Sequence, residues 1–333
     1  MLRKINTLSF IIFILFLNCS EGISQSVSKY AGEFLEIGVG ARSQALGASF
    51  VSIADDGSAI YWNPAGIIQI KSFHTSLMHA EQYGGEINYD FAGVVFPHQD
   101  KYAFGLGLIR LGIDGIPDTR NALIDTVISN GKIDDGERLN LDKVTYFSNA
   151  DYALYFSFAH RRSDRSCFGA NIKMIRRNIG DNSAWGVGFD FGGLFKFKKY
   201  LSFGFNLMDA TTTLISWDTN RKELISPKLK LGAAYTYDSN RIPVKIIPVV
   251  ETDIRFENRD FSSIMSGGFT SIDPHFGLGM IYNDMVSLRF GYDDIKRTSA
   301  GLGVTVSGIN IDYAFTAFDE FKELGNSHKI SLS

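Results

Sequence analysis

The stretch AWGVGFDFGGLFKF, residues 184–197, alternates large and small side chains without a break from Ala184 to Gly192. One face runs from Trp185 to Phe197 through aromatic and branched apolar residues, while the other is mostly glycine and alanine with the single acid Asp190. Period-two alternation is typical of a β-strand with two different faces. A soluble sandwich would show water a face rich in Lys, Glu and Thr, whereas small residues opposite bulky ones suit a confined interior and a lipid-facing exterior. The stretch therefore predicts one strand of a transmembrane barrel.

The same alternation recurs from residue 71 to the end of the chain. No apolar run beyond Ile70 approaches the ~20 residues that a membrane helix needs. We therefore predict an all-β fold, an antiparallel transmembrane β-barrel of about fourteen strands. The expected strands are 72–81, 86–97, 102–114, 148–162, 166–180, 183–197, 201–210, 227–238, 244–256, 275–284, 286–295, 299–307, 309–318 and 326–333.

The connections between these strands alternate in length. Short turns are expected at 99–101, 163–165, 198–199, 238–240, 283–284 and 307–308. Most of the others are longer, with the longest at 115–147, 211–226 and 257–274, although 261–272 also fits an extra strand pair. Short turns on one side and long loops on the other are typical of bacterial outer-membrane barrels, which would place both termini in the periplasm.

The first residues predict export. Arg3 and Lys4 precede an apolar run of about ten residues and a group of small residues near Gly22, which is the pattern of a signal peptide. We expect a signal peptide at 1–24, an N-terminal plug segment at 25–70 and the barrel at 71–333. Removal of the leader would take Cys19 with it and leave Cys167 alone, so no internal disulfide is expected.

Composition and motifs exclude several classes of function. The formal net charge of −3 does not supply the dense Lys/Arg field that nucleic-acid binding needs. The six His residues form no metal-ligand pair on one strand face, and no Gly-x-Ser-x-Gly nucleophile elbow is present. We expect no enzymatic activity and no cofactor.

Residues 41–68, ARSQALGASFVSIADDGSAIYWNPAGII, read neither as leader nor as strand. Pro64 lacks a backbone N–H and biases Asn63 away from helix, so we predict a turn that the Asn63 side chain closes. Asp55 and Asp56 are expected to cap a short helix or to pair with an inward Arg or Lys. The segment is expected to plug the barrel, as a movable gate or as a fixed part of the fold. The candidate plug residues are Arg42, Asp55, Asp56, Trp62, Asn63, Pro64 and Gly66.

Single polar residues interrupt the small-residue faces of the expected strands. Rings of charge can select ions. Alternatively, these side chains pair with one another and with the backbone of the plug, because irregular backbone at membrane depth needs such partners. The lumen-facing candidates are Asp151, Asn171, Lys173, Asp190, Asn206, Arg289 and Asp312.

Residues 130–137, NGKIDDGE, resemble the second half of a calcium loop, with Glu137 in the position of a bidentate ligand. Thr126 and Ile128 stand where the first half of such a loop needs carboxylates, which favours a solvated acidic turn. No metal is therefore predicted, and the partial calcium set would be Asn130, Asp134 and Glu137.

The order and spacing of four motifs, 40–42, 45–47, 54–56 and 62–66, resemble those of the PorV/PorQ family. This family is also grouped with the UPF0164 proteins, within the FadL-like outer-membrane barrels. The segments 282–292 and 324–332 are similar to a late hairpin and the closing strand of these proteins. The resemblance implies a fourteen-stranded barrel with an N-terminal hatch in its lumen, in contact with outer-membrane lipid.

The resemblance implies three alternative functions. We expect first a PorV-like role, binding secreted cargo proteins or type IX secretion components. The alternatives are FadL-like transport of a hydrophobic small molecule and a non-transporting structural barrel. Transport predicts a continuous apolar pocket and a break in the wall, whereas cargo binding predicts a sealed lumen and exposed apolar loop residues. The loop candidates are Leu123, Ile124, Val127, Leu214, Ile215 and Trp217.

Overall fold

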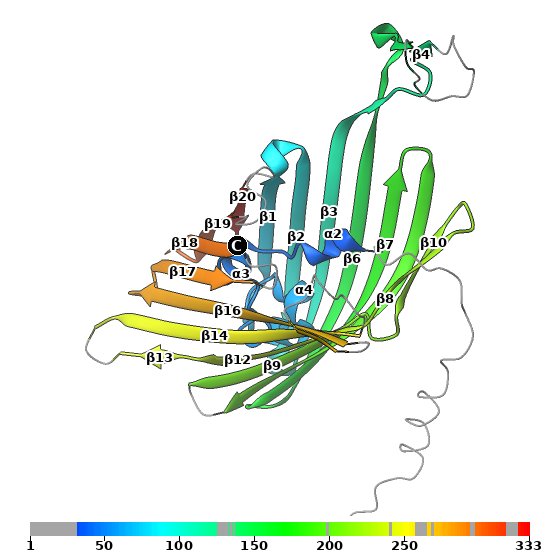
Figure 1. Ribbon diagram of the computed structural model, residues 1–333. Helices are drawn as coiled ribbons and strands as arrows, with labels where there is room; N and C mark the ends of the chain where they lie inside the picture. The colour runs from blue at the N-terminus through cyan, green and yellow to red at the C-terminus, as the bar shows by residue number, and fades with distance from the viewer. Residues whose placement is uncertain are drawn as a thin grey trace, which may run out of the picture.

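The computed structural model describes residues 32–124, 133, 135, 137–197, 200–239, 242–256, 265–267, 270–293, 297–317 and 326–333. Within them, fourteen antiparallel strands form the wall of a closed β-barrel (Figure 1). In wall order these are β1 (His74–Gln82), β2 (Ile87–His98), β3 (Tyr102–Asp118), β6 (Thr145–Ser163), β7 (Ser166–Ile179), β8 (Asn182–Phe197), β9 (Leu201–Met208), β12 (Lys228–Tyr235), β14 (Val244–Arg255), β16 (Thr270–Tyr282), β17 (Val286–Tyr292), β18 (Thr298–Val306), β19 (Ile309–Ala317) and β20 (Ser327–Leu332).

Pairing of the first and last strands closes the barrel. His79 of β1 lies opposite Ile330 of β20, and every other wall strand pairs with its neighbour in the chain order given above. Closure removes the free sheet edges that would otherwise expose unpaired backbone groups to lipid. The predicted fold class is therefore confirmed, and the strands lie within a few residues of their expected positions.

Two predicted loops contain further strands. Residues 211–226 hold β10 (Thr213–Trp217) and β11 (Lys222–Ile225), and β10 extends the wall by pairing with the upper part of β8. Residues 257–274 contain β15 (Met265–Gly267), which pairs with the start of β16. The short β13 (Tyr237–Asp238) pairs with β14. The expectation of a simple long loop at 211–226 was wrong, because its alternation is that of a wall strand.

Two connections on the predicted long-loop side are short, as the expected bounds of these strands already imply. Strands β7 and β8 are joined by a two-residue turn at Gly180, whose φ of 56° is easily adopted by glycine. Strands β1 and β2 are joined by the short η2 (Tyr83–Gly85), and η3 (Gln99–Lys101) joins β2 to β3 on the other side. The alternation of short and long connections is therefore incomplete.

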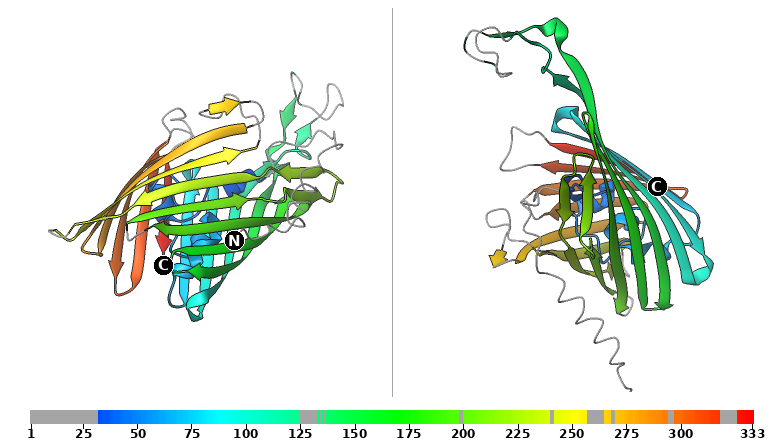
Figure 2. Two further views of the ribbon diagram at one scale, coloured as in Figure 1. Left: turned by 90° about the horizontal axis from the view of Figure 1, so that it is seen from below. Right: turned by 90° about the vertical axis from the view of Figure 1, so that its right-hand side faces the viewer.

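Strands β3 and β6 extend far beyond the rest of the rim (Figures 1 and 2). Their pairing reaches Asp118 opposite Thr145. The extension also carries the short hairpin of β4 (Leu123–Ile124) and β5 (Arg138–Leu139), and the 3-10 turn η4 (Leu141–Lys143). We call residues 114–147, as far as they are described, the β3–β6 extension.

The outer face of the barrel is apolar. Phe96, Phe104 and Phe158 lie opposite one another on adjacent strands, and each remains more than two-fifths exposed. An outward apolar band of this kind is what a transmembrane barrel presents to lipid. Among the described residues, no helix is both long and apolar enough to cross a membrane.

The N-terminal segment, residues 32–70, lies inside the ring of strands (Figure 2). It consists of short helical turns, α2 (Glu33–Glu36), α3 (Ala41–Ala45), α4 (Ala59–Trp62) and η1 (Pro64–Gln69). Glycines on the inner wall allow it to approach closely: a Cβ atom at Gly291 would overlap the backbone of Gly47, and one at Gly169 would overlap that of Ala65. The small inner faces noted in the sequence thus make room for the N-terminal segment.

Candidate functional site

The turn at Asn63 ties the N-terminal segment to the barrel wall. The Asn63 side-chain oxygen accepts a hydrogen bond from the Ala65 N–H at 3.1 Å, and η1 begins at Pro64. The Asn63 amide nitrogen donates to the carbonyl oxygens of Val51 at 2.8 Å and Gly193 at 3.1 Å. Asn63 is fully buried, so all three bonds are shielded from water. The side chain closes its own turn and also bonds to β8.

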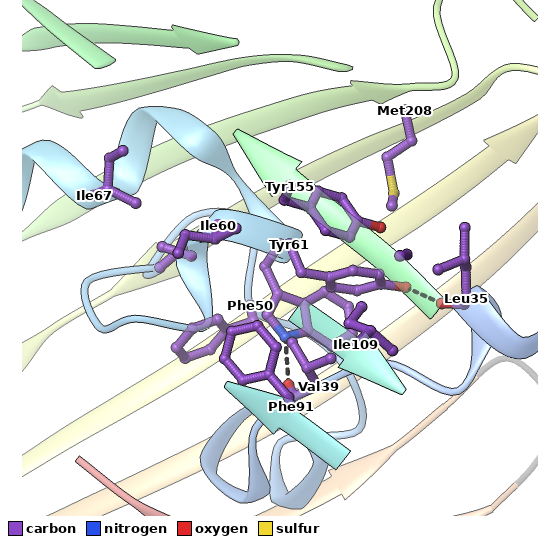
Figure 3. Close-up of a cluster of buried hydrophobic side chains, with 14 of the residues drawn as sticks. Leu35, Val39, Phe50, Ile60, Tyr61, Ile67, Phe91, Ile109, Tyr155 and Met208 are labelled. Carbon is purple, nitrogen blue, oxygen red and sulfur yellow. Dashed lines mark hydrogen bonds between the residues drawn. The ribbon is translucent and has the colours of Figure 1, made fainter. Parts of the chain in front are cut away.

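Aromatic residues of α4 hold the rest of the N-terminal segment together (Figure 3). The Trp62 indole N–H donates to the Val39 carbonyl at 2.7 Å, and the Tyr61 hydroxyl donates to the Leu35 carbonyl. Gly66 packs directly against the backbone of Ala54, where a side chain would not fit. The glycine at this position is a packing requirement.

Arg42, Asp55 and Asp56 form one ionic group. The Arg42 guanidinium lies 2.6 Å from an Asp55 carboxylate oxygen and 3.4 Å from one of Asp56. Asp56 also accepts from the Ser58 N–H at 2.9 Å, at the start of α4. Burial opposes the charge of Arg42, but Asp55 and Asp56 outweigh it and raise the pKa of the Arg42 guanidinium. A cavity of about 260 Å³ beside this group also borders Arg289 and Asp312.

One side of the lumen is apolar. Inward side chains of β2, β3 and β6, among them Phe91, Ile109 and Tyr155, pack on Ile60 and Tyr61 of the N-terminal segment (Figure 3). The same cluster continues through partly buried side chains at the upper ends of the strands and beside α2. These are Ile37, Ile87, Ile113, Trp217 and Ile225.

The opposite side of the lumen is charged. The Lys230 ammonium lies 3.1 Å from Glu251 and 2.6 Å from Asp253, and all three side chains are almost completely buried. The second oxygen of Glu251 accepts from the backbone N–H groups of Phe50 and Val51, at 2.7 and 2.8 Å. The wall therefore supplies the hydrogen-bond partners that this non-helical backbone needs.

A second ionic contact joins the charged side to α2. Glu36 lies 2.7 Å from Lys228 and 2.9 Å from Arg255. Burial alone would raise the pKa of the Glu36 carboxyl, but Arg255 and Lys228 outweigh it and hold that pKa well below its ordinary value. These residues were not predicted from the sequence, although 228 and 230 on β12, and 251, 253 and 255 on β14, each show the period-two spacing of a strand face.

All seven predicted lumen residues are buried, and each has a partner. Asn171 donates to the Ile60 carbonyl at 2.8 Å, and Asn206 donates to the Trp62 carbonyl at 3.0 Å. The remaining five form ion pairs: Lys173 with Asp190 at 3.0 Å, Arg289 with Asp312 at 2.6 Å and Asp151 with Arg177 at 3.1 Å. Asn171, Lys173 and Asp190 form one connected group, the others lie in separate contacts around the N-terminal segment, and the seven are not arranged as a ring.

The wall is interrupted between β9 and β10. Strand β8 pairs with β9 as far as Phe191 and with β10 only from Val187. Asp209 and Thr212, on either side of the gap, have φ values of 53° and 58°. The Asp190 carboxylate accepts from the Asp209 N–H at 2.9 Å. One backbone bond persists in the gap, from the Ala210 N–H to the Phe189 carbonyl at 2.8 Å, and the Asp190 side chain replaces another part of the ladder. At this level Phe191, the next residue of the strand, faces outward.

The predicted loop residues do not form one exposed patch. Ile124 is 46% exposed on the β3–β6 extension and Leu123 is half-buried, while Val127 lies outside the described residues. Ile215 is completely buried, which corrects the expectation of an exposed loop residue, because it faces inward from β10. Leu214 faces outward on that strand, and the Trp217 ring lies under the Arg177 guanidinium at 5.5 Å.

Only one residue of the predicted calcium set lies within the described residues. Glu137 is described and buried, whereas Asn130 and Asp134 lie outside the described residues. Within the described parts of the chain, no group of three or more His, Cys, Asp or Glu side chains is arranged to hold a metal ion.

Comparison with known proteins finds solved structures with a similar fold and no matching family. No protein-family model matches the chain, and no curated protein matches it. Among solved structures it is similar to the toluene transporter TbuX of Ralstonia pickettii, with 13% identity over 89% of this chain and 96% of that one, at a TM-score of 0.52.

The Pseudomonas putida toluene transporter TodX is similar at 13% identity and a TM-score of 0.53, over 89% of this chain and 96% of that one. A FadL homologue from Pseudomonas aeruginosa has the same identity and TM-score, over 85% and 94% of the two chains. The chain therefore has the fold of the FadL-like barrels.

Proposed function

We propose that the protein is an outer-membrane barrel that admits small hydrophobic compounds. The observation that carries this proposal is the apolar side of the lumen, which continues from Ile87 and Ile113 at the upper strand ends to Tyr61 in the N-terminal segment. These side chains pack against the N-terminal segment, and where that segment shifts away they can replace water around an apolar solute. The similar fold of two toluene transporters supports this reading over the PorV-like one.

The interruption between β9 and β10 supports a lateral route out of the lumen. The gap spans Asp209 to Thr212 and adjoins Phe191 in the outward apolar band. Lys173 bridges Asp190 and Asp209 on the inner side, at 3.0 and 2.8 Å. A compound that leaves here would pass the Lys173 ion pairs and enter the hydrocarbon layer without reaching the Lys230 group on the opposite side of the lumen.

In this proposal the N-terminal segment acts as the plug. Ile60, Tyr61 and Ile67 are completely or almost completely buried, so the segment fills the lumen beside the apolar side chains. Passage requires it to shift relative to the wall. We also propose the signal peptide, the periplasmic termini and the outer-membrane location that the sequence predicts.

The test is solute uptake by vesicles that contain the purified full chain. We expect faster uptake of toluene than by protein-free vesicles and no increase for a sugar of similar size. Equal acceleration of both solutes would indicate an open water-filled pore and would contradict the proposal. If neither toluene nor the sugar enters faster than in protein-free vesicles, the proposed transport role is wrong.

The β3–β6 extension favours a second candidate function, the binding of a partner protein as in type IX secretion. Leu141 and Tyr146 are 78% and 70% exposed, beside Ile124 and Leu139. Exposed apolar groups at this density are typical of a protein-binding surface. Replacement of Leu141 and Tyr146 by Ser should abolish co-purification of secretion components while leaving toluene uptake unchanged; loss of uptake instead would argue against this role.

A further inference from the structure

The outward apolar band ends at a row of polar and aromatic side chains on five neighbouring strands. Asp90 lies opposite Arg110, Arg110 opposite Tyr152, Tyr152 opposite Arg176, and Arg176 opposite Trp185. We call these five residues the polar row. Their side chains face away from the lumen. Such a row is typical of the level at which lipid headgroups begin.

The polar row carries surplus positive charge on its β6–β8 side. Arg110 lies 3.2 Å from one oxygen of Asp90, and His79 lies 2.7 Å from the other. The Arg176 guanidinium instead stacks at 4.7 Å over the Trp185 ring, and no carboxylate in the described residues lies within ion-pair distance of it. Asp90 is thus already paired, while Arg176 remains available to an anion.

A groove of about 490 Å³ lies on the outer surface directly beneath Asp90 and Arg110. Ala92 lies between Leu77 and Leu108 in the register of β1, β2 and β3, so its small side chain leaves a hollow between two leucines. Ile330 and Leu332 of β20 line the same groove. Its walls are hydrocarbon and its upper end is charged.

We propose that this surface binds one phosphate-bearing lipid of the outer leaflet, with the phosphate at Arg110 and Arg176 and an acyl chain in the groove at Ala92. The inference rests on the proposed insertion in the outer membrane. Guanidinium groups match the geometry of phosphate oxygens, and Tyr152 between the two arginines adds a hydroxyl. The sheet is closed at this point, so it offers no free backbone edge to a protein strand.

The test uses Trp185 as a built-in reporter. Only three Trp residues are present, and the other two, Trp62 and Trp217, belong to the luminal cluster. The full chain is placed in vesicles of equal amounts of phosphatidylcholine and phosphatidic acid, in which one lipid or the other carries brominated chains, which quench nearby tryptophan. We expect phosphatidic acid to be enriched at Trp185, with each arginine contributing about fivefold.

Replacement of Arg110 and Arg176 by Gln should remove the enrichment, and Ala92→Phe should reduce it by filling the groove. The matched control is Arg162→Gln, an exposed position near the other end of β6, which should leave the enrichment unchanged. The circular dichroism of each variant confirms that the barrel has folded.

Equal quenching by the two brominated lipids in the unmodified protein would overturn the lipid site but leave membrane insertion intact. The same enrichment in the double arginine variant would also overturn the site. Quenching by neither lipid would contradict the membrane placement itself, and with it the proposed function.

Discussion

The two sides of the lumen hold the N-terminal segment by different physical means. On the apolar side, Ile109 and Tyr155 contact it through non-directional packing, which tolerates sliding. On the charged side, Glu251 accepts hydrogen bonds from the backbone of the segment, and Glu36 of the segment pairs with Lys228 and Arg255, through contacts whose geometry is specific. In the proposed function, the charged side anchors the segment while a solute passes along the apolar side.

The largest expected effect is on the charged side. Lys230→Ala leaves Glu251 and Asp253 buried without their shared cation, and breaking such a buried pair costs about 3–5 kcal/mol. We expect a clear loss of thermal stability, measured by the temperature at which the barrel band shifts in gel electrophoresis. The exposed Lys222→Ala on β11 serves as control. Similar midpoints for both variants would show that the ionic group does not anchor the segment.

A smaller effect is expected where wall and segment touch through backbone. Gly291→Ala places a Cβ against Gly47 and should cost about 1–3 kcal/mol as an overpacked contact. At Gly279 the nearest atom to such a Cβ lies 3.8 Å away, so Gly279→Ala should cost much less. Protease protection of the N-terminal segment would separate the two variants. Equal protection would contradict the close packing at Gly291.

The contact between Glu36 and the wall should depend on pH. Because Arg255 and Lys228 lower the pKa of Glu36 in the folded protein, its stabilising effect is fully present above the unfolded pKa of about 4.3 and is lost as the pH falls toward the folded value. Glu36→Gln should therefore destabilise the segment at pH 7 and have little effect at very low pH. If the difference in stability between Glu36→Gln and the unmodified protein grew as the pH fell, that result would contradict the prediction.

The smallest effect is expected on the apolar side. The Tyr155 hydroxyl is buried and has no hydrogen-bond partner in the described part of the chain. Tyr155→Phe should change stability by less than about 1 kcal/mol, and in the stabilising direction, because an unsatisfied buried hydroxyl is removed. The thermal unfolding midpoints of Tyr155→Phe and Lys230→Ala, measured together, test the difference between the two sides of the lumen. A large loss of stability would mean that Tyr155 has a polar role.

Period-two alternation predicted the wall strands, because a barrel wall imposes different chemistry on its two faces. It also indicated the turn at Asn63, since proline restricts the residue before it. Local patterns do not specify which distant strand an inward residue meets. The bond from Asn63 to Gly193 and the burial of Ile215 depend on barrel closure and on the break after Met208.

The most direct test of the central claim is a reversible cross-link between the N-terminal segment and the wall. A Cβ at Gly107 of β3, on the apolar side, would lie 2.7 Å from the Ile60 Cγ2, which is one bond from the Ile60 Cβ, so a disulfide is within reach in the double variant Ile60→Cys, Gly107→Cys. We predict that oxidation lowers toluene uptake by vesicles to the protein-free rate and that reduction restores it, while each single variant is insensitive to both treatments. Equal uptake by the oxidised and reduced double variant would contradict passage through a lumen that the segment must open.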